Sequence, residues 1–147
     1  MRRGSIRGPY NRGRGASVAT IDRWGSLGRV MALGAAYDFV FAVAILGFTR
    51  AAARWLGLAV PEDPVYLALC GVLLTILAGV YALAALDPRR YAGVAPLSAA
   101  GRTLGFLLFV WAWRGGRPEA FLALASADLA LAAVTVLAWA RARNAEP

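Results

Sequence analysis

The chain has 147 residues, of which 60% are hydrophobic and 16% are charged, and its 16 basic residues, all arginine, give a formal net charge of +8. Soluble proteins carry about 25% charged residues, so this composition argues against an ordinary soluble domain and for an integral membrane protein. With one cysteine, Cys70, and no histidine, the chain offers no internal disulfide, no dithiol redox pair and none of the usual haem or zinc ligand sets.

Residues 1–28 form a tail rich in arginine and glycine, which we expect to be disordered on its own because it has little apolar surface to bury. Three roles remain open for it. An anionic lipid surface would attract it by about 1 kcal/mol per arginine, and a partner protein could order it as a docking arm. RNA binding is the weakest alternative, because the tail has no folded module and Tyr10 is the only residue among 1–17 that could stack on a base.

The remaining residues, 29–143, form the predicted membrane domain. Its first apolar segment covers residues 30–48 and contains one charge, Asp38. At about 1.5 Å per residue, this segment can cross most of a hydrocarbon core of about 30 Å. Residues 49–60 either continue the first helix or lie in the membrane interface. Both alternatives fit the polar and aromatic residues of this piece, which are Arg50, Arg54 and Trp55.

Three further segments are long and apolar enough to span a bilayer. They are residues 65–86, which carry no charge, residues 94–113, which contain Arg102, and residues 120–140, which contain Asp128. Proline or paired glycines interrupt the sequence between the spans. The predicted fold is therefore all-α, an integral membrane four-helix bundle. A soluble all-α bundle is disfavoured because the second segment has no polar face.

The arginines are unevenly placed. Most lie in the tail, in the connection after the second span and at the C-terminus, and fewer lie in the other two connections. The positive-inside rule then places both termini in the cytoplasm. All five tryptophans fall at predicted span ends, where the interface suits a ring that is apolar apart from its N–H. They are Trp24 and Trp139 on the cytoplasmic side, and Trp55, Trp111 and Trp113 on the outer side.

The three charges inside the spans lie at similar depths. Counted from the cytoplasmic ends, Asp38 lies roughly 12 Å deep, Arg102 up to roughly 12 Å and Asp128 roughly 18 Å. An isolated charge there costs about 3 kcal/mol, so we expect the three to pair. Two acids against one arginine leave one negative charge, so one aspartate would hold a proton. The alternatives are an ion pair that fixes helix register, a proton or ligand site, and an arginine that snorkels to the interface.

Small residues at four-residue spacing predict close helix contacts in lipid. Gly101 and Gly105 form a GxxxG pair in the third span, and Ala78 and Ala82 form a similar pair in the second. The spacing does not distinguish contacts within the chain from contacts to another subunit. We favour contacts within the chain, because a four-helix bundle must pack its own helices first.

The two halves of the domain also echo each other. Gly28-Arg29 recurs as Gly101-Arg102, and Tyr66–Leu69 parallels Phe121–Leu124. A duplication would arrange the spans as two parallel helical hairpins. The end of the second span, YALAALDPRRY, the Gly-Arg of the third and the small residues of the fourth resemble small four-helix bacterial membrane proteins of the DoxX and BphX-like kind. This resemblance covers Arg29 to about Trp139, and it implies a location in the bacterial inner membrane and a non-catalytic partner role.

The sequence shows no nucleophile–base pair, phosphate loop or acid pair of hydrolytic type. We therefore expect no enzymatic activity, no cofactor and no metal. Two functions remain. The first is an accessory subunit that stabilises a larger membrane complex, with lipids and a membrane protein as partners. The second is a small proton-coupled transporter that acts as a homo-oligomer. The sequence does not identify the partner or any substrate.

Overall fold

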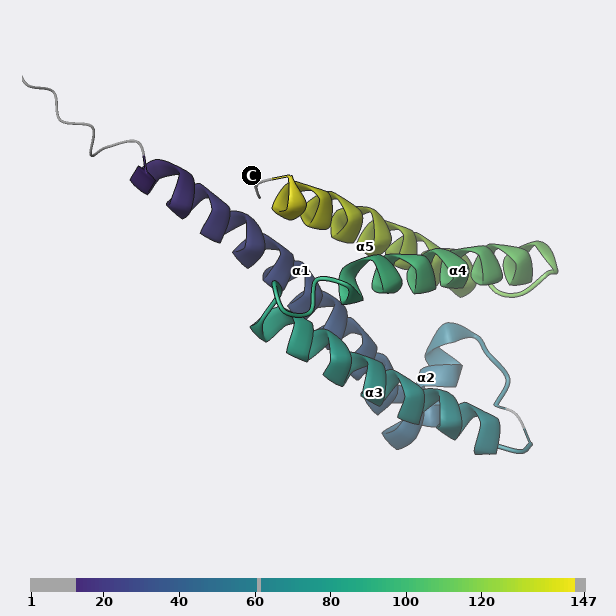
Figure 1. Cartoon of the computed structure of the whole chain (residues 1–147). Coiled ribbons are helices and arrows are strands. Elements are labelled where there is room, and N and C mark those ends of the chain that lie inside the picture. The colour runs from purple at the N-terminus through teal and green to yellow at the C-terminus, as the bar shows by residue number, and fades with distance from the viewer. Residues whose placement is uncertain (1–12, 61, 145–147) are drawn as a thin grey trace, which may run out of the picture.

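The computed structural model describes the backbone of residues 13–60 and 62–144 and the side chains of residues 23–60 and 62–144. Within these ranges every regular element is a helix (Figure 1). The helices are α1 (Gly13–Gly47), α2 (Thr49–Leu56), α3 (Val65–Leu86), α4 (Val94–Arg114) and α5 (Ala120–Arg143).

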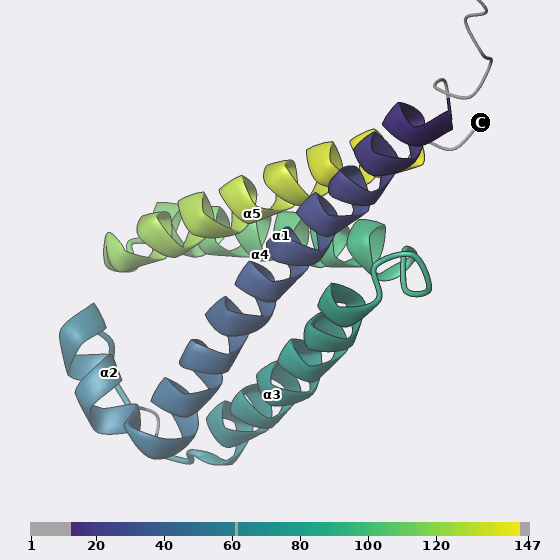
Figure 2. The ribbon, with the colours of Figure 1, turned by 90° about the vertical axis from the view of Figure 1, so that its left-hand side faces the viewer.

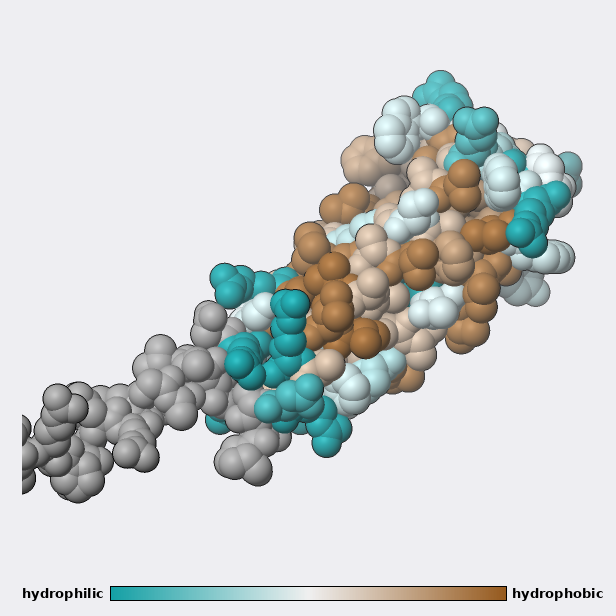
Figure 3. Space-filling model, turned by 90° about the horizontal axis from the view of Figure 1, so that it is seen from above, coloured by the Kyte–Doolittle hydropathy of each residue, from teal (hydrophilic) through white to brown (hydrophobic). Residues whose placement is uncertain are grey.

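Four of these helices contain a stretch long and apolar enough to cross a membrane. The stretches are Arg23–Gly47, Val65–Leu86, Val94–Arg114 and Ala120–Arg143. The predicted all-α fold with four spans is thus confirmed, and the chain is a multi-pass membrane protein. Figure 3 fits this assignment, because hydrophobic side chains cover the middle of the molecule and hydrophilic ones gather at its two ends. Lipid, rather than water, is the solvent for most of this surface.

The spanning helices form two antiparallel hairpins, α1 with α3 and α4 with α5, and α1 also packs against α5. Figures 1 and 2 show that the hairpins lie together at one end and diverge toward the other. We call the first the terminal end, which holds the α3–α4 connection (residues 87–93) and the last turns of α5. We call the second the α2 end, which holds α2 and the α4–α5 connection (residues 115–119).

The first helix begins earlier than the sequence predicts. The disordered tail was expected to end at residue 28, but α1 starts at Gly13, so residues 13–28 are helical instead. Residues 1–12 of the predicted tail lie outside the described residues. Trp24 and Leu27 explain part of the difference, because both are buried within the described structure. Side chains that pack against neighbouring helices stabilise helical backbone that the composition alone would leave disordered.

The hydrophobic core lies at the terminal end. It unites side chains from all four spanning helices: Trp24, Leu27, Met31, Tyr81, Ala84, Ala95, Ala138 and Ala142. The predominance of alanine lets the helix backbones approach closely. Gly28 also allows a close approach, since a Cβ built there would lie 2.9 Å from the backbone carbonyl oxygen of Ala85. Any larger residue at this position would push α1 away from the last turn of α3.

Helix α2 answers the question that the sequence left open for residues 49–60. The backbone leaves the helical region at Phe48, with φ of −132°, so α1 does not continue. The left-handed Gly57, with φ of 69°, ends α2. A Cβ built at Gly57 would lie 4.0 Å from that of Pro118. Helix α2 therefore reaches from the end of α1 toward the α4–α5 connection, across the gap between the diverging hairpins (Figure 2).

Candidate functional site

The structure brings together the three charged residues predicted inside the spans. Asp38 comes from the last third of α1, Arg102 from the first half of α4 and Asp128 from the third turn of α5. All three are buried, with 3%, 6% and 8% of their surface exposed, respectively. We call Asp38, Arg102 and Asp128 the charge cluster. It lies where the two hairpins still contact each other.

The guanidinium group of Arg102 lies between the two carboxylates. Its Nη2 atom is 3.0 Å from Oδ1 of Asp38, and its Nη1 atom is 3.1 Å from Oδ1 of Asp128. Nη2 also donates a hydrogen bond of 3.3 Å to the carbonyl oxygen of Gly34. Each aspartate thus takes one nitrogen of the guanidinium, and one arginine connects the two hairpins. The fixed fork of arginine suits this double pairing better than the single ammonium of lysine would.

Two tyrosine rings complete the surroundings of Arg102. Its Cζ atom lies 5.1 Å from the ring centroid of Tyr37 and 5.6 Å from that of Tyr81. These are cation–π distances, at which the aromatic ring stabilises the positive charge. Tyr81 belongs to α3, so Arg102 contacts all three of the other spanning helices. Like the hydrophobic core, the charge cluster therefore connects all four spanning helices.

Glycines make the room that the charge cluster needs. A Cβ built at Gly34 would lie 3.3 Å from Nη2 of Arg102, and one at Gly105 would lie 2.7 Å from Oδ2 of Asp128. A side chain at Gly105 would displace the Asp128 carboxylate. Of the predicted GxxxG pair, Gly105 therefore lies at a contact between α4 and α5.

The other predicted packing residues differ in their burial. Gly101 is exposed, and a Cβ built there would meet nothing within 4 Å among the described atoms. Ala78 is buried but Ala82 is exposed. For Gly101 and Ala82 the prediction of contacts within the chain is therefore corrected. The buried faces follow the helical period from Ala78 to Tyr81 and from Ala99 to Arg102, which turns positions 82 and 101 outward.

The charges of the cluster do not balance when every group is ionised. Two carboxylates face one guanidinium, and Oδ2 of Asp38 is buried without a hydrogen-bond partner in the described part of the chain. Buried polar atoms of this kind are rare and costly. The alternative in which Arg102 snorkels to the interface does not fit the structure, because the side chain is buried between α1 and α5. The geometry can fix the helix register, and Asp38 is the site where a proton could be held.

Four hydroxyl groups in the spans make local hydrogen bonds. Thr75 donates to the carbonyl oxygen of Gly71, and Thr103 to that of Ala99, each one turn earlier. Ser126 and Thr135 do the same in α5. Among the described residues, no group of three or more histidine, cysteine or acidic side chains could hold a metal ion.

The predicted interface anchors occupy different environments. Trp55 is 88% exposed, and Trp111 and Trp113 are also exposed at the α2 end. Trp139 is half-buried, with Cζ of Arg143 5.3 Å from its ring centroid. Trp24 is instead buried in the core at the terminal end, with 5% of its surface exposed. It therefore holds helices together rather than facing the lipid headgroups.

Sequence reasoning missed three residues that contact Arg102. Gly34 and Tyr37 both lie within one helical turn of Asp38, so their spacing could have placed them beside it. Tyr81 gave no such signal, because it lies on a different helix from every charge in the cluster.

Comparison of the chain with protein-family models, with curated proteins and with solved structures found no significant match.

Proposed function

We propose that this protein is a non-catalytic membrane subunit that scaffolds a larger complex. The observation that carries the proposal is the pairing of Arg102 with both Asp38 and Asp128. A charged group that is to handle a substrate needs a free face, whereas this guanidinium is used between carboxylates and aromatic rings. Such a cluster stabilises one arrangement of helices.

The surface adds a second line of support. Helices that pack in pairs expose much of their side-chain area, and exposed leucines extend over α3, α4 and α5. In lipid these faces are available to the small-residue contacts that join membrane subunits. Gly101 and Ala82 lie on such faces. The resemblance to DoxX and BphX-like proteins agrees with a partner role, although no family model matches the chain.

Affinity purification tests the proposal. The full chain, tagged at its C-terminus, is isolated from its native membrane in a mild detergent, and its partners are identified by mass spectrometry. We expect one membrane protein or complex to co-purify in fixed proportion with the tagged chain and to be lacking from an untagged strain. Recovery of the chain alone, after crosslinking before solubilisation, would contradict a scaffolding role.

The same proposal includes a location in the bacterial inner membrane with both termini in the cytoplasm. Of the arginines whose side chains the structure describes, six lie at the terminal end and four at the α2 end, so the positive-inside rule favours this orientation. Reporter fusions at the C-terminus and at Gly115 check it. We expect the C-terminal fusion to report the cytoplasm and the Gly115 fusion the opposite side. Reversed signals would show that the arginine count does not set the topology.

A proton-coupled transporter is the second candidate, and the buried Oδ2 of Asp38 favours it. A carboxylate that alternates between a proton and a cationic substrate would have such an atom. The test measures protons released when tetraphenylphosphonium, a lipophilic cation, is added to the purified protein. The control variant is Glu119→Gln, because Glu119 is exposed and its side chain makes no cap hydrogen bond. Proton release that is lost in Asp38→Asn but kept in Glu119→Gln would support transport. Lack of release from the unmodified protein would count against it.

A further inference from the structure

Helix α2 carries two arginines that the charge cluster does not use. Arg50 and Arg54 are four residues apart, so they lie on one face of the helix. None of the residues of α2 is buried. In the described part of the chain, neither arginine forms an ion pair with an acidic side chain. Two arginines thus lie one turn apart on a short helix, with no acidic partner among the described residues.

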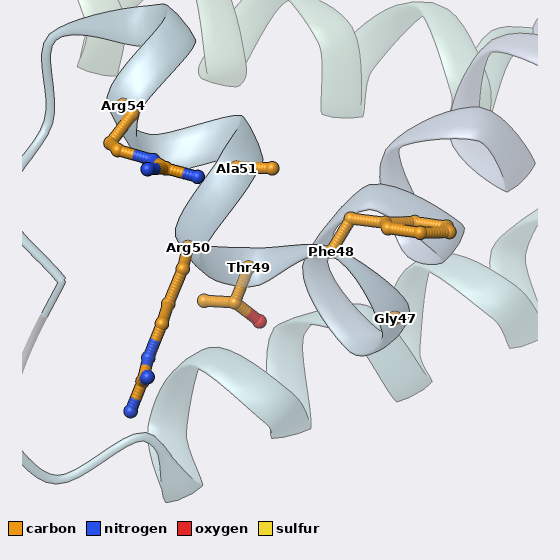
Figure 4. A pocket seen from close by; sticks show the side chains of 6 residues that line it. All are labelled: Gly47, Phe48, Thr49, Arg50, Ala51 and Arg54. Carbon is orange, nitrogen blue, oxygen red and sulfur yellow. The ribbon is translucent and has the colours of Figure 1, made fainter.

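A hollow of about 390 Å³ opens beside these arginines (Figure 4). It lies where α1 ends and α2 begins, and its lining contains no acidic residue. The lining consists of Gly47, Phe48, Thr49, Arg50, Ala51 and Arg54. The Thr49 hydroxyl donates to the carbonyl oxygen of Ile45, so it is fixed at the side of the hollow. The chemistry of this lining favours an anion with several acceptor oxygens.

The position of α2 shows which anion can reach it. The spanning stretch of α1 has 25 residues, which gives about 37 Å of helix and exceeds a hydrocarbon core of about 30 Å. Helix α2 follows directly, so it lies at the level of the lipid headgroups. Trp55 and Phe48 are exposed on the same segment, as expected of a helix that lies in the interface.

We propose that Arg50 and Arg54 bind the phosphate of an anionic phospholipid at the α2 end. Arginine pairs with phosphate through two parallel hydrogen bonds, and its weak hydration suits the interface. Phe48, which lines the hollow, and Leu46, which precedes the lining residue Gly47, are both exposed and offer an apolar surface to the acyl chain. The site is separate from the charge cluster and does not depend on the scaffolding role.

The test compares lipid retention by three full-length proteins in native mass spectrometry. Each is purified in detergent with equal amounts of phosphatidylglycerol and the zwitterionic phosphatidylcholine. The variants are Arg50→Gln/Arg54→Gln and a matched control, Arg114→Gln/Arg117→Gln, which removes the same charge from exposed residues at the same end. Circular dichroism and gel filtration verify that both variants fold.

We expect the unmodified protein and the control pair to retain phosphatidylglycerol, and Arg50→Gln/Arg54→Gln to lose about tenfold or more in retention, as two phosphate contacts predict. Equal losses in both variants would show general charge attraction and overturn the site. Retention of both lipids alike by the unmodified protein would overturn it as well. Displacement of phosphatidylglycerol by inorganic phosphate at millimolar concentration would show a site for free phosphate rather than for lipid.

Discussion

The two ends of this bundle are built from similar residues but pack differently. At the terminal end, side chains from all four spanning helices form one core around Trp24, Leu27 and Tyr81. At the α2 end, each helix packs mainly against its partner in the hairpin, and the hairpins diverge (Figures 1 and 2). Hydrophobic side chains alone therefore do not hold membrane helices together, since lipid satisfies them equally well.

The terminal end differs from the α2 end in its short interhelix connection and in the charged contacts beside it. The seven-residue connection 87–93 keeps α3 and α4 close, and Arg102 joins α4 to the other three helices just beyond it. Past Arg102, contacts between hairpins give way to contacts within them. We infer that the charge cluster marks the limit of the joined region. The predictions below test this difference between the ends, from the largest effect to the smallest.

The largest expected effect follows from Arg102→Ala. Loss of one partner from a buried ion pair costs about 3 to 5 kcal/mol, and here two carboxylates lose their partner at once. We expect the purified protein to unfold at a much lower temperature in detergent, as measured by circular dichroism. Arg114→Ala, an exposed arginine of the same helix, is the control. Equal stability of the two variants would mean that the cluster does not join the hairpins.

Trp24→Ala tests the core at the terminal end against Trp55→Ala at the α2 end. Removal of the buried Trp24 should lower the free energy of unfolding by about 3 kcal/mol, because a large cavity remains between helices. Removal of Trp55, which is 88% exposed, should change it by less than about 0.5 kcal/mol. Unfolding titrations in mixed micelles measure both. Similar losses at the two positions would remove the proposed difference between the ends.

Gly105→Ala and Gly101→Ala form a matched pair on one helix. The new Cβ at position 105 would lie 2.7 Å from Oδ2 of Asp128, and such overpacking costs about 1 to 3 kcal/mol. At position 101 the methyl group would meet open space, so we expect a change within about 1 kcal/mol, in the stabilising direction. The reverse order in an unfolding titration would place the contact face of α4 on the side of Gly101.

The smallest effect is the coupling between Arg102 and Asp38. Adding Asp38→Asn to Arg102→Ala should cost less than the sum of the two single changes, by about 0.5 to 3 kcal/mol. The control adds Trp55→Ala to Arg102→Ala and should be additive within about 0.5 kcal/mol, since Trp55 lies at the other end. Additivity in both cycles would show that the two side chains of the cluster do not stabilise each other.

Parts of the fold and of the site could be predicted because they depend on local composition. The span Val65–Leu86 coincides with the predicted segment, because a segment of this length without charge is expected to cross a bilayer as one helix. The pairing of Asp38, Arg102 and Asp128 follows from their depth along each helix and from the cost of a lone charge in lipid. The pairing requires in addition that the three side chains face the bundle interior, which the cost of a lone charge in lipid favours.

The small-residue spacing did not predict how each helix is rotated about its own axis, and so which of its faces is buried. Gly105 faces Asp128 while Gly101 faces outward, and Ala78 is buried while Ala82 is exposed, although each pair has the same spacing. In α3 no charged residue marks the buried face, so the spacing alone could not show it. In α4 the buried Arg102 marks that face, and Gly105, three residues further on, shares it while Gly101 does not. The start of α1 was missed for a related reason, since only packing of Trp24 and Leu27 against other helices reveals that this segment is part of the bundle.

The sequence by itself determined that the chain crosses the membrane four times and that its buried charges must meet, because length and charge fix depth in a bilayer. The tertiary structure decided which helix face turns inward, that Tyr37 and Tyr81 flank Arg102, and that the hairpins part toward α2. Those features depend on side-chain fit between helices, and in lipid no difference in hydrophobicity marks that fit along the sequence.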